Sequence, residues 1–194
     1  MKQTRSFCLA SASPRRRDLL AQYGLEFSVH PVEVDEQRLA GEDPPDYVKR
    51  LAALKAGEAK SSHADHVILA GDTVVVLDGD IMGKPRDGEE AADMIGRLSG
   101  RTHRVLSAYT LLDGATGANY TQAPETLVTF RALPQAWIEW YSRLPEARDK
   151  AGAYAIQGMG GAMVERIEGS WSTVVGFPME AIVWDLLDRG WVTL

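Results

Sequence analysis

The chain has 194 residues, of which 45% are hydrophobic and 25% are charged, a composition typical of a globular protein. Its formal net charge of -6 excludes a general basic surface for nucleic acid, so any anion site must be local. The single cysteine, Cys8, excludes an internal disulfide and a metal site built from several cysteines. No apolar stretch approaches the roughly 20 residues of a membrane-spanning helix, and the N-terminal apolar run is too short for a signal peptide. We therefore expect one domain over residues 1–194 in a reducing cytoplasm, with neither a nucleic acid nor a membrane as partner.

The first elements carry clear local signals. Residues 7–10 form a short apolar run that is typical of a buried strand. Ser13 and Pro14 then predict the start of a helix, with the Ser13 hydroxyl as its cap, and Gly24 predicts its end.

The remaining elements alternate along the chain. Further strands are predicted over residues 27–34, 67–77, 80–83, 104–112, 125–132, 153–157 and 162–167, and further helices over residues 46–60, 89–98, 135–143 and 180–188. Asp78 and Gly79 predict a tight turn between the strands 67–77 and 80–83. This alternation favours an α/β fold, and the hairpins make its central sheet mixed.

Asp72 interrupts an otherwise apolar run from Val67 to Leu77. An ionised carboxylate is costly to remove from water unless a cation, a metal or several hydrogen bonds compensate its charge. Lys84 follows a few residues later, after the hairpin, where a surface lysine is the simpler interpretation. Together the two residues indicate a centre that handles metal and phosphate.

Three arginines occupy the first turn of the predicted first helix, where acidic residues are usual. A helix N-terminus favours phosphate, and Ser11 lies just before this one. Helical spacing places Arg15 and Arg16 on or near the buried arc and Arg17 toward solvent. The alternative is a solvated basic patch paired with Asp18.

Other polar residues leave two interpretations open. Lys55 shares the apolar face of helix 46–60, so it either extends to the helix edge or points into a cleft to meet an anion. Asp72 with one acid from the cluster Glu33, Asp35 and Glu36 would suffice for magnesium or manganese, although a solvated acidic loop is preferred for Glu33 and Asp35. Gln157, in a segment of small residues, either reads a base edge or belongs to a simple turn.

Seven short segments together resemble the Maf family of nucleoside triphosphate pyrophosphatases. They are residues 9–16, 47–56, 70–74 (Ala-Gly-Asp-Thr-Val), 83–85 (Gly-Lys-Pro), 98–103, 149–158 and 169–178. They occur in the family's order and cover nearly the whole chain. The resemblance implies a mixed sheet flanked by helices, two lobes with a cleft, a fold related to inosine triphosphate pyrophosphatases, and a homodimer.

The resemblance also implies an activity. It is the metal-dependent cleavage of dTTP and UTP, and of modified pyrimidine nucleotides, to a monophosphate and pyrophosphate. The alternatives are a 7-methyl-GTP pyrophosphatase and a nucleotide-binding regulator of septum formation. The cofactor would be a divalent cation, magnesium or manganese.

Residue by residue, the resemblance implies a site. Asp72 looks like the catalytic base. Glu36 and Asp72 look like the residues that bind the metal. The family's phosphate-binding positions correspond to Ser11, Arg15, Lys55 and Lys84 of this chain. The positions that distinguish the family's substrates correspond to Arg15, Thr73 and Gln157. In a regular strand Asp72 and Thr73 face opposite sides, so we expect the strand to end or bulge at Gly71 if both serve one site.

Overall fold

The computed structural model describes residues 1–194 and divides the chain into two compact units. Unit 1 comprises Met1–Asp72, Ser107–Pro124 and Gly176–Leu194, and unit 2 comprises Thr73–Leu106 and Glu125–Val175. Two long strands, β4 (Val67–Leu77) and β6 (Thr102–Asp113), contribute residues to both units.

Unit 1 contains a mixed sheet. Strand β2 (Phe7–Leu9) lies between β3 (Phe27–Val29) and β4, and both pairings are parallel. Strand β6 and its antiparallel partner β7 (Asn119–Gln122) continue the sheet after β4. A separate antiparallel pair joins β1 (Lys2–Gln3) to β10 (Val192–Thr193).

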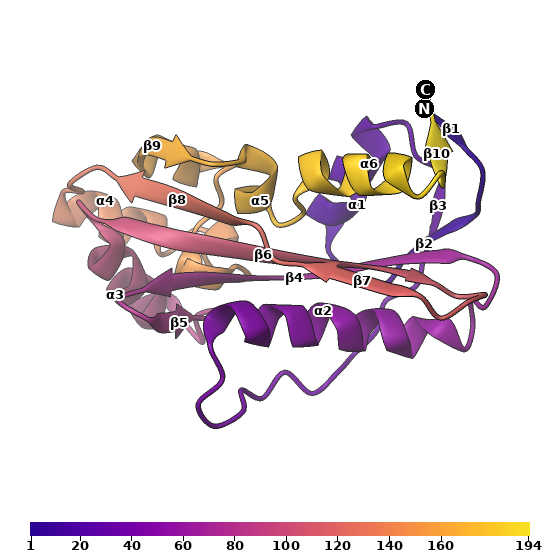
Figure 1. Cartoon of the computed structure of the whole chain (residues 1–194). Coiled ribbons are helices and arrows are strands. Elements are labelled where there is room, and N and C mark those ends of the chain that lie inside the picture. Colours follow the sequence, from indigo (N-terminus) through magenta and orange to yellow (C-terminus); the bar gives the residue numbers. More distant parts are fainter. The chain divides into compact units, whose positions relative to one another are not determined.

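Helices cover both faces of this sheet (Figure 1). Helix α2 (Pro44–Lys60) lies on one face, and α1 (Pro14–Gln22) and α6 (Met179–Asp188) lie on the other. Ala56 and Ala59 of α2 belong to one buried cluster with Ile68 and Ala70 of β4. Because side chains alternate along a strand, Asp72 also faces α2.

Gly71 lies on the opposite face of β4, where the packing leaves no room for a side chain. A Cβ atom at this position would stand 2.8 Å from the Ala108 carbonyl oxygen and 3.0 Å from the Phe177 ring. A backbone oxygen within a strand cannot move away cheaply. We therefore expect Gly71→Ala to lower the free energy of unfolding by about 1–3 kcal/mol, measured by urea denaturation.

Gly57 in α2 provides a matched control, because nothing lies within 4 Å of a Cβ atom added there. Gly57→Ala should raise the free energy of unfolding by about 0.5–1 kcal/mol, since alanine is the better helix former. A Gly71→Ala protein as stable as the wild type would contradict the packing around β4.

Unit 2 surrounds its own core. In it, β4 pairs with β5 (Asp80–Met82), and β8 (Glu125–Phe130) lies between β6 and β9 (Val164–Glu168). Its helices are α3 (Gly88–Leu98), α4 (Gln135–Tyr141) and α5 (Trp171–Val175), with 3-10 helices η1 (Pro145–Ala147), η2 (Ala151–Ala153) and η3 (Met159–Met163). The buried residues of these elements include Ile95, Phe130 and Tyr141.

The hairpin between β4 and β5 confirms the prediction for its turn. Asp78 and Gly79 both have positive φ, 54° and 89°, as a two-residue hairpin turn requires. The mixed α/β class is likewise confirmed, and none of the helices combines the length and apolar character needed to cross a bilayer.

Several local predictions were wrong. The strand predicted over 27–34 ends at Val29, and no strand forms over 153–157, where a 3-10 helix ends at Ala153 and an irregular stretch leads into a turn. The Ser13 hydroxyl does not cap α1; the Ser13 backbone N–H donates to Ser11 Oγ at 3.2 Å instead. The short elements β1, β7, β10 and α5 were not predicted.

A buried histidine in unit 2 makes stability depend on pH. His103 in β6 is 1% exposed, packs edge-on against Phe130, and has its Nε2 2.9 Å from the Tyr154 hydroxyl. Burial lowers the pKa of His103 to about 4. The unfolded chain, with a histidine pKa near 6.5, binds a proton that the folded chain lacks between these values. The stabilisation is therefore complete above about pH 6.5 and is lost as the pH falls toward 4.

We expect the free energy of unfolding to fall by about 3 kcal/mol from pH 7 to pH 4 because of this histidine, measured by urea denaturation at the two pH values. His103→Gln keeps the other three histidines but removes this titration, so its loss should be smaller. Equal losses in the two proteins would contradict the assignment to His103.

Candidate functional site

The candidate site lies beyond the carboxyl ends of the parallel strands of unit 1. The paired register ends at Leu9 in β2 and at Leu69 in β4, and Ser11 and Asp72 follow two and three residues later. Glu36 comes from the connection that leaves β3. Ligands of α/β sheets commonly bind at this edge, because the segments leaving neighbouring strands converge there.

Lys55 of α2 joins two carboxylates at this edge. Its Nζ donates to Asp72 Oδ1 and to Glu36 Oε1, each at 2.7 Å. The side chains of Lys55 and Asp72 are only 12% and 13% exposed, whereas that of Glu36 is 57% exposed. Lys55 therefore points inward, and it supplies the compensating charge that a buried Asp72 requires.

The two carboxylates also fit a divalent cation. Because both accept from one nitrogen, the Asp72 and Glu36 oxygens lie at most twice 2.7 Å apart. No group of three or more His, Cys, Asp or Glu side chains with metal-binding geometry occurs in the chain. Magnesium and manganese need only one or two protein carboxylates when substrate phosphates complete their coordination, so this donor set is sufficient.

Arg16 links α1 to two other segments of unit 1. One is the loop just before the helix, and the other is the segment that begins at Gly176. Its Nη1 donates to Ser11 Oγ at 3.2 Å, and its Nε donates to the Gly176 carbonyl oxygen at 2.9 Å. These bonds fix the loop between β2 and α1. Ser11 is buried there, next to the helix N-terminus.

The arginines and the carboxylates of unit 1 influence one another electrostatically. Burial lowers the pKa of Arg16 from its usual range, the Asp72 and Glu36 carboxylates raise it, and Arg15 lowers it. Arg15 is half-buried, whereas Arg17 is exposed and lies 3.4 Å from Asp18. The predicted orientations of the three arginines are thus confirmed.

The connection that carries Glu36 is held by residues of α2. The Tyr47 hydroxyl donates to the Glu36 carbonyl oxygen at 2.8 Å, and Arg50 forms a two-pronged ion pair with Glu42 at 2.6 and 2.9 Å. The hydrogen bond from Arg50 lowers the pKa of Glu42 to about 2, so this pair persists at any ordinary pH. Burial, and then the charges of Asp72 and Glu36, raise the pKa of Tyr47.

Strand β4 runs without interruption from Val67 to Leu77, so it does not end at Gly71, and a bulge at Gly71 stays a prediction. Without such a bulge, strand alternation places Thr73 with Val75, on the face opposite Asp72. A regular strand through residues 70–74 would count against Thr73 and Asp72 contacting the same part of a ligand. A role for Thr73 in substrate choice stays a prediction.

Lys84 and Gln157 lie in unit 2, and both are exposed. The Gly152 N–H donates to the Gly83 carbonyl oxygen at 3.1 Å, which places the start of the segment 149–158 beside Lys84. A Cβ atom at Gly152 would lie 2.9 Å from Val75 Cγ2, so this segment packs against the face of β4 that carries Thr73.

A search for related proteins gives a family match over almost the whole chain. Residues 6–189 match the family described as Maf-like protein. The chain belongs to the Maf family.

Relatives in this family carry names that describe an activity. The chain is 49% identical to the dTTP/UTP pyrophosphatase of Myxococcus xanthus (strain DK1622), over 96% of this chain and 93% of that protein. It is 42% identical to the dTTP/UTP pyrophosphatase of Syntrophus aciditrophicus (strain SB), over 98% and 93% of the two chains.

Two solved structures with much lower sequence identity share the fold. A HAM1 protein from Coxiella burnetii superposes with a TM-score of 0.58 at 15% identity, over 95% of this chain and all of that one. The Ham1 protein of Staphylococcus aureus gives a TM-score of 0.55 at 11% identity with the same coverage. These similarities place the Maf fold beside that of the HAM1 proteins.

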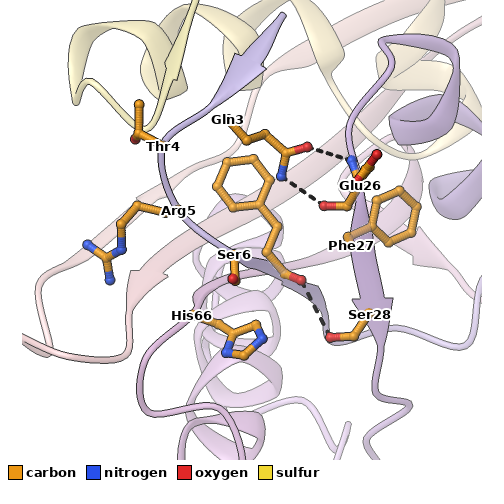
Figure 2. Close-up of a pocket in the computed structure, with 9 residues that line it drawn as sticks. Gln3, Thr4, Arg5, Ser6, Glu26, Phe27, Ser28 and His66 are labelled. Carbon is orange, nitrogen blue, oxygen red and sulfur yellow. Dashed lines mark hydrogen bonds between the residues drawn. The ribbon is translucent and has the colours of Figure 1, made fainter.

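A surface pocket at the opposite end of the parallel strands does not belong to this site (Figure 2). It lies at the amino ends of β2 and β3, where the Gln3 amide bonds to the backbone N–H and carbonyl of Glu26 at 2.6 and 2.8 Å. Arg5 pairs with Asp113, and the His66 ring bonds to Asp65. Its polar groups therefore hold the fold together.

Sequence reasoning missed the supporting residues of the candidate site. Tyr47, Glu42 and Arg50 carried no signal of their role, because they act across a connection of irregular structure. Arg16 was recognised as an anion candidate, but its bonds to Ser11 and Gly176 depend on segments 5 and 160 residues away.

Proposed function

We propose that this protein hydrolyses dTTP and UTP, and modified pyrimidine nucleotides, to the nucleoside monophosphate and pyrophosphate with the help of a divalent cation. The names of its Maf relatives support this substrate class. The observation that carries the proposal is the convergence of Asp72, Glu36 and Lys55 at the carboxyl edge of the parallel strands.

The chemistry follows from what these side chains are. Cleavage of a phosphoanhydride needs a water held in line and the phosphate charge neutralised. Asp72 would hold the attacking water and accept its proton. Lys55 lies against that carboxylate, so it can orient Asp72 and contact a phosphate oxygen.

The other cationic groups would hold the triphosphate. Ser11 and Arg15 stand at the N-terminus of α1, where backbone N–H groups favour phosphate. Lys84 is exposed in unit 2, and its role as a further phosphate contact stays a prediction from the family resemblance. Asp72 and Glu36 would hold the cation, which would withdraw charge from the phosphates.

Product identification tests the proposal. The purified protein is incubated with dTTP, UTP and 7-methyl-GTP separately, with magnesium or manganese, and products are separated by anion exchange. We expect dTMP or UMP with pyrophosphate. Nucleoside diphosphate with phosphate would contradict the bond cleaved, and preference for 7-methyl-GTP would contradict the base. Binding without turnover would favour the nucleotide-binding regulator of septum formation.

We also propose that the protein works as a homodimer in the cytoplasm, from its resemblance to Maf proteins and its single buried cysteine. Analytical ultracentrifugation gives the mass in solution directly. A purely monomeric protein across the micromolar range would contradict the dimer.

A further inference from the structure

Gln157 stands at the tip of a turn whose position depends on its backbone. The Gly158 N–H donates to the Ala155 carbonyl oxygen at 3.2 Å, and the Gly161 N–H donates to the Gly158 carbonyl oxygen at 3.1 Å. The Gln157 side chain is exposed. Whatever fixes the backbone of this turn therefore sets where the Gln157 amide points.

Two side chains from outside the turn hold its backbone. The Tyr141 hydroxyl at the end of α4 accepts from the Ala155 N–H at 3.1 Å, and Glu146 Oε1 in η1 accepts from the Gly160 N–H at 2.9 Å. Burial, and also the Glu146 carboxylate, raise the pKa of Tyr141, so its hydroxyl remains protonated.

The glycines of the turn make this contact possible. A Cβ atom at Gly158 would stand 2.1 Å from Glu146 Oε2, and a Cβ atom at Gly160 would stand 2.5 Å from the Tyr141 hydroxyl. Since real atoms never approach so closely, the carboxylate and the hydroxyl occupy the space that side chains would fill. The turn flanking Gln157 is thus built to fit these two groups.

We infer that Glu146 and Tyr141 are positioning residues that aim Gln157 at the base of the nucleotide. The inference rests on the proposed function together with the sequence-based prediction that Gln157 reads a base edge. A carboxamide presents N–H donors on one side and an oxygen acceptor on the other, and in one fixed orientation these match the O4 and N3–H of thymine or uracil. Cytosine presents the reverse pattern, so a displaced Gln157 loses discrimination between the two bases.

The test is a double-mutant cycle on specificity. The ratio of kcat/KM for dTTP to that for dCTP is measured in the wild type, Glu146→Ala, Gln157→Ala and the double variant. We expect each single change to lower the ratio about tenfold, the worth of one hydrogen bond. The double variant should be no less selective than Gln157→Ala, because Glu146 acts through Gln157.

Further variants separate positioning from general damage. Glu146→Gln keeps an oxygen acceptor and should recover most of the ratio, and Glu139→Ala, at an exposed acid on α4, should leave the ratio unchanged. Hydrogen exchange at the Gly160 N–H should accelerate in Glu146→Ala. An unchanged ratio despite faster exchange, or an additional loss in the double variant, would overturn the inference.

The wild type alone reports on the proposed function. If it prefers 7-methyl-GTP, the substrate assignment fails, and the same cycle run with 7-methyl-GTP against GTP still decides whether Glu146 acts through Gln157. If the wild type hydrolysed no nucleotide, both the proposed function and this inference would be wrong.

Discussion

Asp72→Asn is expected to lower kcat for dTTP about a thousandfold while nucleotide binding changes less than about threefold. Asparagine keeps an oxygen to accept from Lys55 Nζ, so the cluster should stay folded. It loses the negative charge that would take a proton from water. The measurements are pyrophosphate release and, for binding, calorimetry with dTTP.

A second buried acid of unit 1 supplies the control. Asp113 is 6% exposed and pairs with Arg5 at 2.9 Å, at a different part of the unit. Asp113→Asn should lower stability and leave turnover per folded molecule unchanged. If Asp72→Asn released pyrophosphate at the wild-type rate, Asp72 would have no place in the mechanism.

Lys55→Met should reduce kcat/KM for dTTP about a hundredfold or more. The variant removes the proposed phosphate contact and leaves the poorly exposed Asp72 beside Glu36 without a compensating charge. Breaking such a pair destabilises by roughly 3–5 kcal/mol when it is fully buried, and less here because Glu36 is exposed. Thermal unfolding and steady-state kinetics report the two effects separately.

The same variant has a signature that a surface lysine would not give. With Lys55 gone, a divalent cation can lie between the two carboxylates without competition, so manganese should raise the Tm of Lys55→Met more than that of the wild type. Lys49→Met on the same helix loses only an exposed pair with Asp46 at 4.0 Å and should change stability by less than about 0.5 kcal/mol. A manganese effect equal in all three proteins would show that Asp72 and Glu36 do not bind the cation.

Sequence reasoning succeeded where the deciding forces are local. Helical spacing placed Lys55 on the buried face of α2, and the apolar run around Asp72 predicted a carboxylate that needs a compensating charge, which Lys55 supplies. The turn at Asp78 and Gly79 needs positive φ, which few residue types accept, so two residues were enough to predict it. These rules depend only on local backbone geometry, so they hold whatever other segments pack against the element.

The failures come from contacts between distant segments. Residues 153–157 are mostly apolar and suit a strand, but the Tyr141 hydroxyl takes the Ala155 N–H, and Glu146 holds the backbone of the turn that follows at Gly160. Strand β1 exists because β10, almost the whole chain away, pairs with it. The connection carrying Glu36 is fixed by Tyr47 and by the Glu42–Arg50 pair. Hydrophobic periodicity in the sequence does not predict such bonds.

The three-part composition of unit 1 bears on how the protein is made. On the ribosome, β2 and β4 emerge early, yet α6 and Phe177, which pack on one face of their sheet, are translated only after the last segment of unit 2. Until then α1 is the only helix on this face, so part of the apolar sheet stays exposed on the nascent chain, where such surfaces favour aggregation. Glu36, Lys55 and Asp72 are translated earlier and meet on the side of α2, so the surroundings of this carboxylate do not wait for the third segment of unit 1.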